Sequence, residues 1–187
     1  MSFQSTPWQT VGPYYRLGLE PLYRVDIAPA GARGERVQVQ GQVFDGVGVP
    51  VADAVLEIWQ ADAQGIYAHP EDPRHADHDP VFDGWGRVPT DAEGRFAFTT
   101  IRPGSVPGPR GQAQAPHLTV LVFMRGLLRA ASARLYFSDA PGTADDPILA
   151  LVPAERRSTL VAQAQGNGLY HWDVRMQGEH ETVFFDY

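Results

Sequence analysis

The residues best suited to bind a metal lie in one short segment, at positions 69–79. The candidate ligands in it are His69, His75, Asp77, His78 and Asp79. Imidazole nitrogens and carboxylate oxygens bind divalent metals, so this segment could hold such an ion. Its proline and aspartate content is also typical of a solvated acidic loop. Both interpretations remain open from the sequence.

Two polar residues border an apolar run at 118–124. His117 opens the run, but the next residue on the same side of an extended chain is Thr119, a poor metal ligand. Arg125 ends the run. A guanidinium at that position either pairs with a carboxylate of its own domain or faces an anionic ligand or partner.

Several kinds of chemistry are excluded. The sequence has no GxSxG, P-loop, GxGxxG or HExxH motif. It has no cysteine, which excludes disulfides and cysteine-ligated metals. A net charge of -7 argues against nucleic-acid and anionic membrane partners. Because no apolar run approaches the roughly 20 residues of a membrane span and the first residues lack a signal-peptide pattern, we expect a cytoplasmic protein.

The elements that must position these residues are mostly strands. The 187 residues suffice for one domain, and Gly and Pro separate short segments of alternating character, which is typical of an all-β sandwich. We expect strands at 37–44, 55–60, 95–101, 118–124, 134–137, 169–175 and 182–185, with 118–124 buried on both faces. Residues 153–165, downstream of an acidic pair and Pro147, are expected to be helical.

Two segments show no periodic pattern. Residues 103–116 form a long loop rich in Gly and Pro, and long loops in compact domains are often functional. Residues 5–22 combine Trp8, Tyr14, Tyr15 and Leu17 with prolines and glycines. Exposed aromatic residues need a surface to bury against. This arm either packs on its own domain or on another chain.

Four strings in order along the chain resemble the intradiol ring-cleaving dioxygenases. They are TPWQTVGPY at 6–14, LEIWQADAQGIY at 56–67, the Gly-rich stretch at 84–104, and the stretch at 177–186. The resemblance implies a transthyretin-like (prealbumin-like) two-sheet β-sandwich at 37–187 with long loops and one or two short helices. It also implies an N-terminal arm at 1–36 that packs on a partner subunit.

The first and last strings are similar to the iron-free, alpha type of chain found in two-chain members of this family. For such members, the resemblance implies that both atoms of O2 are inserted into 3,4-dihydroxybenzoate to give 3-carboxy-cis,cis-muconate. It also implies a homologous iron-binding beta chain as partner and a higher-order oligomer of such pairs. Neither the number of pairs nor the range of ring substituents follows from the sequence.

In the iron-bearing chains of this family, two tyrosinates and two histidines hold Fe(III). The matching positions here are Arg74, Val106, His117 and Thr119. One of the four ligands is kept, and a cation at position 74 would repel a ferric ion. The resemblance therefore implies that this chain binds no metal, has no catalytic residue of its own, and leaves Fe(III) to the beta chain.

The resemblance also implies that the alpha chain helps to line the partner's active site. The residues concerned are Thr10, Gly12, Pro13, Tyr14 and Arg125. Glycine and proline bring rigid backbone close to a ligand, and arginine favours an anionic aromatic acid. Two alternatives remain: a metalloenzyme that uses the 69–79 histidines, and a transthyretin-like small-molecule binding module without catalysis.

Overall fold

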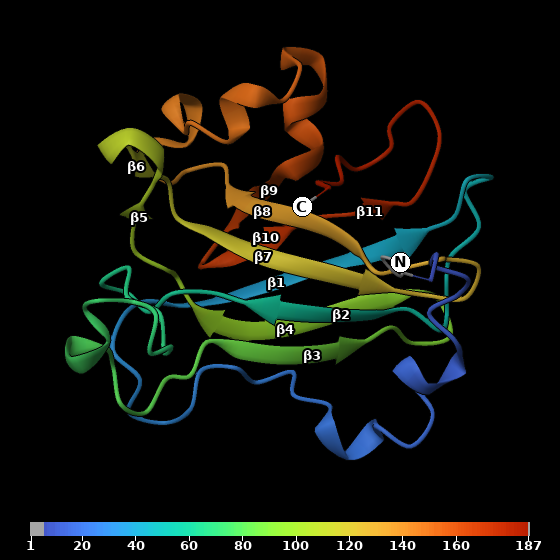
Figure 1. The fold of residues 1–187 in the computed structure, drawn as a ribbon, viewed down its shortest axis with the longest axis horizontal. Coiled ribbons are helices and arrows are strands. Elements are labelled where there is room, and N and C mark those ends of the chain that lie inside the picture. Colours follow the sequence, from blue (N-terminus) through green and yellow to red (C-terminus); the bar gives the residue numbers. More distant parts are fainter. Residues whose placement is uncertain (1–5, 187) are drawn as a thin grey trace, which may run out of the picture.

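A computed structural model describes residues 6–186 and shows two β-layers packed face to face (Figure 1). One layer contains, in spatial order, β3 (Trp85–Pro89), β2 (Val55–Trp59), β7 (His117–Phe123) and β8 (Ala131–Phe137). The other contains β4 (Arg95–Ile101), β1 (Arg36–Phe44), β10 (Leu169–His171) and, at the end of β1, β11 (Val174–Arg175). Strand β9 (Val161–Gly166) joins the layers because it pairs with both β8 and β10. The expected all-β sandwich is confirmed.

Short elements fill the connections. A small hairpin is formed by β5 (Val106–Pro107) and β6 (Ala113–Gln114). The 3-10 helices are η1 (Pro13–Tyr15), η2 (Glu20–Leu22), η3 (His75–Asp77), η4 (Pro109–Gly111), η5 (Thr143–Asp145), η6 (Leu149–Leu151) and η7 (Ala154–Leu160). In the part of the chain that is described, no helix has the length and apolar character to cross a membrane.

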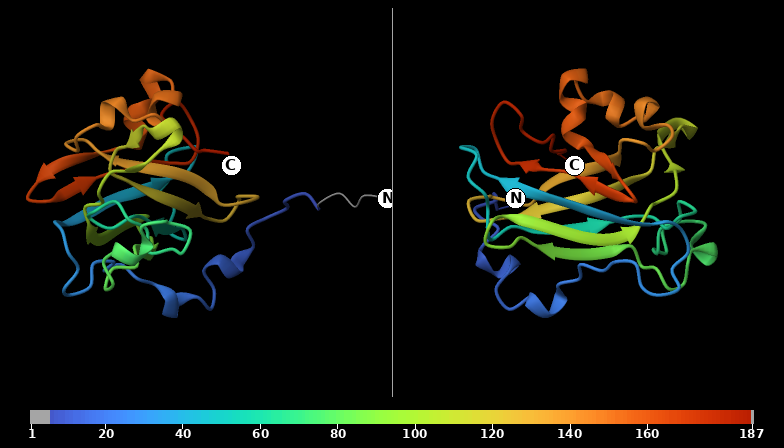
Figure 2. Two further views of the ribbon diagram at one scale, coloured as in Figure 1. Left: turned by 60° about the vertical axis from the view of Figure 1, so that its left-hand side comes forward. Right: turned by 180° about the vertical axis from the view of Figure 1, so that it is seen from behind.

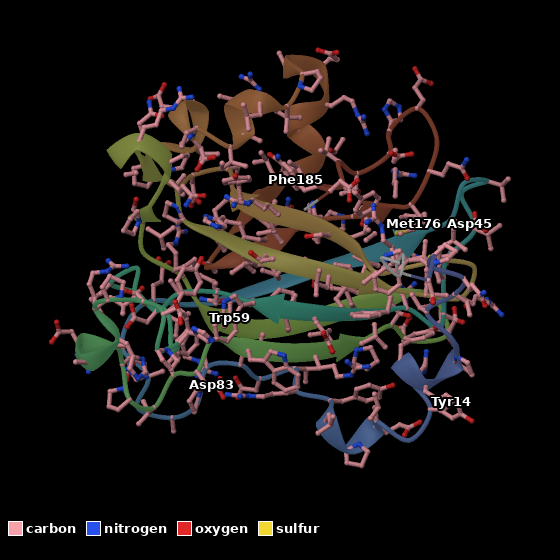
Figure 3. All side chains as sticks on the ribbon, in the orientation of Figure 1. Tyr14, Asp45, Trp59, Asp83, Met176 and Phe185 are labelled. Atoms are coloured by element: carbon pink, nitrogen blue, oxygen red, sulfur yellow. The ribbon has the colours of Figure 1, made fainter. Side chains whose placement is uncertain are left out.

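The N-terminal segment has two parts. Residues 24–28 close one edge of the sandwich: Arg24 exchanges backbone hydrogen bonds with Arg87 of β3, and the Ile27 N–H donates to Thr99 of β4. Ile27 is fully buried in the core. The segment left free to contact a partner therefore ends before residue 24. Figure 2 shows the first described residues, from Thr6 on, lying away from the sandwich, and Figure 3 shows Tyr14 on the outer side of η1.

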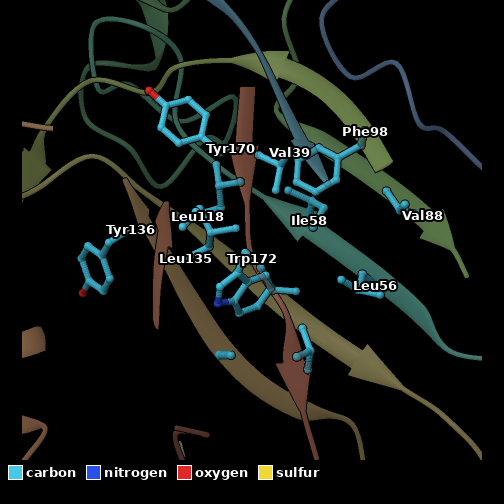
Figure 4. Packing of buried hydrophobic residues seen from close by; sticks show 14 of the residues in the cluster. Val39, Leu56, Ile58, Val88, Phe98, Leu118, Leu135, Tyr136, Tyr170 and Trp172 are labelled. Atoms are coloured by element: carbon cyan, nitrogen blue, oxygen red, sulfur yellow. The ribbon is translucent and has the colours of Figure 1, made fainter. Parts of the chain in front are cut away.

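The core lies between the two layers and follows from the alternation along each strand. In β1, the valines at 37, 39 and 43 and Gly41 are buried, while the alternate residues are exposed or half-buried. Trp172 packs edge-on against Phe96, and its indole N–H donates to the Thr159 carbonyl at 2.9 Å. Figure 4 shows Val39 and Trp172 in one cluster with labelled core residues of β2, β7 and β8, which include Leu56, Ile58, Leu118 and Leu135.

Three expectations about the strands were wrong. Residues 153–165 are helical only as far as Leu160, because β9 finds backbone partners on both sides, and this outweighs a helix propensity of tenths of a kcal/mol per residue. Strand β7 is buried on one face only, and Thr119, Leu121 and Phe123 lie half-buried on the other. At 182–185, one bridge from Phe185 to Ser132 replaces the expected strand.

Gly41 gives a test of the packing between β1 and the segment that joins β10 to β11. A Cβ at this position would lie 1.7 Å from the Trp172 carbonyl oxygen, and backbone cannot yield that much space. We expect Gly41→Ala to lower the free energy of unfolding by about 3 kcal/mol or more, since the two chain segments must separate. Urea unfolding would measure it, with the exposed neighbour Gln40→Ala as the control. Equal stability of the two variants would contradict this packing.

Candidate functional site at the base of the arm

A cavity of about 570 Å³ lies between the arm and one end of the sandwich. Its lining includes residues 10–13 and 15–17 of the arm, together with Asp53, Arg125 and Gly126. The structure thus brings Thr10, Gly12, Pro13 and Arg125 to a single cavity, although they lie far apart in the sequence. Tyr14 is the exception: its side chain is 76% exposed and does not line the cavity.

Tyr15 holds the base of the arm on its own domain. Its ring stacks on Phe123 of β7 with 6.2 Å between centroids. Its hydroxyl donates to the Asp53 carbonyl at 2.8 Å, and its own carbonyl accepts from the Arg87 guanidinium. Before this point the chain is more exposed, and Trp8 is 70% exposed. The arm therefore packs on its own domain at its base and leaves apolar surface uncovered beyond it.

Of the three charged residues that line the cavity, Arg16 and Asp53 are half-buried and Arg125 is exposed. Its Nε lies 3.4 Å from Asp53 Oδ2, and its side chain is 77% exposed. Arg125 thus pairs with a carboxylate of its own domain and still faces the open cavity. Burial, followed by the Asp53 charge, raises the pKa of Tyr15 to about 12. The Tyr15 hydroxyl therefore stays protonated near neutral pH and can donate.

The four positions that match iron ligands are not assembled as a metal site. Arg74 and Val106 line a second cavity, of about 420 Å³, beside Trp59 and Tyr67. The Arg74 guanidinium donates to Asp72 and to the Gly65 carbonyl. Of the other two positions, 117 is in the core and 119 lines a separate hollow on the outer face of the sheet. An imidazole in the core and a guanidinium in a separate cavity do not supply the anionic ligands that suit a ferric ion.

His117 is 4% exposed, and its Nδ1 lies 2.8 Å from the Ala115 carbonyl oxygen. Burial, reinforced by the nearby positive charge of Arg134, lowers the pKa of His117 to about 4. His117 is therefore neutral in the folded chain at physiological pH. Its surroundings are those of a core residue whose ring nitrogen has a backbone hydrogen-bond partner.

This depressed pKa predicts a loss of stability in acid. The unfolded chain binds a proton on His117 below about pH 6.5, whereas the folded chain does so only near pH 4. Folding stability is therefore lost as pH falls through that window, by roughly 3 kcal/mol in total. Urea unfolding of wild type and His117→Gln would measure this, because the variant lacks the titrating group. Parallel stability curves for the two proteins would contradict it.

The side chains of the 69–79 segment contact one another and neighbouring backbone. The rings of His75 and His78 stack at 4.8 Å, and Asp79 accepts the Arg33 N–H at 2.7 Å and the Val81 N–H at 3.2 Å. Among residues 6–186, no group of three or more His, Cys, Asp or Glu side chains is arranged to hold a metal. The structure therefore gives no support to a metal site in this segment.

Tyr15 and Asp53 are among the cavity residues that the sequence analysis did not identify. Tyr15 differs from Tyr14 by one position, and an arm without periodicity gives no signal as to which tyrosine faces inward. Asp53 precedes β2 in a short turn with no recognisable motif. The one indication in the sequence was indirect. If Arg125 pairs within its own domain, some carboxylate must be its partner, but the sequence does not say which one.

Comparisons with known proteins bear on this geometry. A family model described as Dioxygenase matches residues 22–178. The chain is 44% identical to the protocatechuate 3,4-dioxygenase alpha chain of Burkholderia cepacia, over 99% of this chain and 98% of that one. The chain belongs to the intradiol ring-cleaving dioxygenase family. The resemblance stated from the motifs is therefore confirmed.

Two further comparisons place this intradiol dioxygenase family member. It is 37% identical to the protocatechuate 3,4-dioxygenase beta chain of Burkholderia cepacia, over 80% of this chain and 67% of that one. Its fold is similar to the dioxygenase domain of a dioxygenase–carbohydrate-binding protein fusion from Streptomyces sp. SirexAA-E, with a TM-score of 0.62 and 26% identity over 93% of this chain and 99% of that one. The match to the alpha chain thus covers a larger share of both aligned sequences than the match to the beta chain.

Proposed function

We propose that this chain is the alpha, iron-free subunit of a heteromeric protocatechuate 3,4-dioxygenase. The complex would cleave 3,4-dihydroxybenzoate with O2 to 3-carboxy-cis,cis-muconate. The observation that carries the proposal is the state of the four ligand positions, where Arg74, Val106 and Thr119 stand in place of two tyrosines and a histidine. Full-length similarity to an alpha chain supports it.

In this proposal, Fe(III) belongs to the homologous beta chain. Ferric iron supplies a Lewis acid that binds the catecholate form of the substrate. Because the matching positions of this chain do not fit that ion, its contribution is confined to its own side chains and backbone. The side chains and backbone concerned are those that line the cavity between the arm and the sandwich, which would face the partner's site.

Each cavity residue has a physical role in the proposal. The Arg125 guanidinium attracts the substrate carboxylate into the site. Gly12 has a φ of 69°, which favours glycine, and the space beside its Cα is open, so a ligand or partner can approach the backbone. Pro13 restricts the same segment. Thr10 braces the turn, since its hydroxyl accepts the Gly12 N–H at 3.0 Å.

Association with the beta chain would cover the exposed apolar side chains of the arm. Trp8, Tyr14, Leu17 and Leu22 are each at least about half exposed. Aromatic and aliphatic residues left uncovered on an irregular segment are typical of a surface that another chain covers. Tyr14 then belongs to the partner contact, on the other side of η1 from the cavity.

Co-expression tests the proposal. With a homologous chain that carries the two tyrosines and two histidines, we expect a stable complex that converts 3,4-dihydroxybenzoate with O2. A transthyretin-like carrier would instead remain alone and bind small molecules without converting them. Failure to co-purify with such a beta chain would contradict the subunit assignment. Higher-order assembly and a cytoplasmic location remain predictions from the sequence.

A further inference from the structure

Asp53 is the point where the arm and Arg125 meet. Its Oδ2 lies 3.3 Å from the Tyr15 hydroxyl and 3.4 Å from Arg125 Nε. Its carbonyl oxygen accepts the same Tyr15 hydroxyl at 2.8 Å. One residue therefore contacts both Tyr15 and Arg125, two residues of the cavity lining that are far apart in the sequence.

The backbone around Asp53 is held by side-chain hydrogen bonds to its carbonyl groups. The buried Thr90 hydroxyl lies 2.8 Å from the Val51 carbonyl and 3.2 Å from the Ala54 carbonyl. Arg16 of the arm donates to the Ala52 carbonyl at 2.8 Å. The turn at 51–54 is thus held on both sides, so it presents the Asp53 carboxylate in a defined place.

The Asp53 carboxylate does not stabilise its own turn. In two other turns of this chain, Asp45 and Asp91 each accept two backbone N–H groups with one carboxylate oxygen. Asp53 accepts no backbone N–H within the described residues, and its Oδ1 has no hydrogen-bond partner there. The carboxylate is directed entirely to Tyr15 and Arg125.

We infer that Asp53 is a positioning residue that holds Arg125 at the cavity, in register with the arm. The inference rests on the proposed function, because it assigns Asp53 a part in how the complex binds its anionic substrate. An exposed ion pair of this kind adds little to stability. The ion pair instead fixes the position of the Arg125 guanidinium, because a long exposed side chain without that contact samples many rotamers.

The direction in which KM changes when the Asp53 charge is removed distinguishes two roles for this carboxylate: holding Arg125 in place, or repelling the anionic substrate. Removing a carboxylate near an anionic substrate would, by Coulomb repulsion alone, tighten binding and lower KM. If Asp53 instead acts by holding Arg125, its neutralisation frees the guanidinium and raises KM. Asp53→Asn isolates this difference, because the amide keeps the size of the side chain and the backbone carbonyl still accepts the Tyr15 hydroxyl.

The test is saturation kinetics of the alpha–beta complex on 3,4-dihydroxybenzoate. We expect Asp53→Asn to raise KM about 3- to 10-fold with kcat within about twofold, and Asp53→Glu to recover part of the loss. In an Arg125→Ala background, Asp53→Asn should add little, because its effect passes through Arg125. Asp26→Asn, which breaks an exposed 3.0 Å pair with Arg36 away from the cavity, is the matched control.

Two results would overturn the inference: a KM that is unchanged or lower in Asp53→Asn, or effects of the Asp53 and Arg125 changes that simply add. Loss of folding would be recognised by thermal unfolding of the same complexes, and the Asp53→Glu variant then decides the case through its KM. A wild-type complex with no ring-cleaving activity would instead overturn the proposed function itself.

Discussion

Replacing Arg125 by alanine is expected to raise the KM of the complex for 3,4-dihydroxybenzoate by roughly tenfold to a hundredfold. A hydrogen bond between charged groups contributes about 1.5–3 kcal/mol, and each 1.4 kcal/mol is a factor of ten in affinity. Since the side chain is 77% exposed, the fold should not depend on it. Steady-state kinetics together with thermal unfolding would separate the two effects.

The effect of Arg125→Ala should depend on the charge of the substrate. For 4-methylcatechol, a neutral ring of similar size, the same substitution should change KM or the inhibition constant only slightly. Arg129→Ala is a matched control, because Arg129 lies in the same hairpin connection and pairs with Asp186 at 2.6 Å, outside the cavity lining. An unchanged KM for 3,4-dihydroxybenzoate in Arg125→Ala would rule out its assigned role.

Replacing Tyr15 by alanine is the second large effect that we expect. The substitution removes the stacking on Phe123 and the hydroxyl bond to Asp53, two of the contacts that hold the base of the arm. Truncating a partly buried aromatic residue costs about 3 kcal/mol, so the arm should detach and kcat/KM of the complex should fall about a hundredfold. Tyr15→Phe keeps the ring and should stay within a few-fold of wild type.

Limited proteolysis would show whether the arm has detached in Tyr15→Ala. Cleavage near Arg16 or Arg24 should become faster in the variant while the sandwich, probed by thermal unfolding, is little changed. If kcat/KM and the cleavage rate both match those of wild type, the arm is not held through Tyr15. The assignment of the cavity as part of the substrate site would then lose its structural basis.

Much of the fold could be read from the alternation of side chains. Strand β4 is as expected and β1 differs by one residue, because one face of each is buried and a strand has a period of two. Residues 153–165 were misassigned because their polar, Ala-rich composition suits a helix, whereas β9 is fixed by partners distant in sequence. Single-sequence patterns do not contain that information.

The candidate site shows the same division between residues that local sequence patterns identify and residues that depend on contacts distant in sequence. The motifs supplied Gly12, Pro13 and Arg125 as candidates, and the structure places all three on one cavity. Tyr15 and Asp53 could not be found in this way, since their roles depend on contacts between segments far apart in the chain. The absence of an iron site in this chain is inferred from residue types alone, since arginine and valine are not ligands for Fe(III) wherever they lie.

The most direct test of the account is where the iron is. Metal analysis and O2-dependent cleavage of 3,4-dihydroxybenzoate should be measured for this chain alone, for the beta chain alone and for their complex. We expect this chain alone to be free of iron and inactive, and the complex to be active with one iron per pair of chains, lost when the beta-chain tyrosines are replaced. Stoichiometric iron together with ring cleavage in this chain alone would contradict the account.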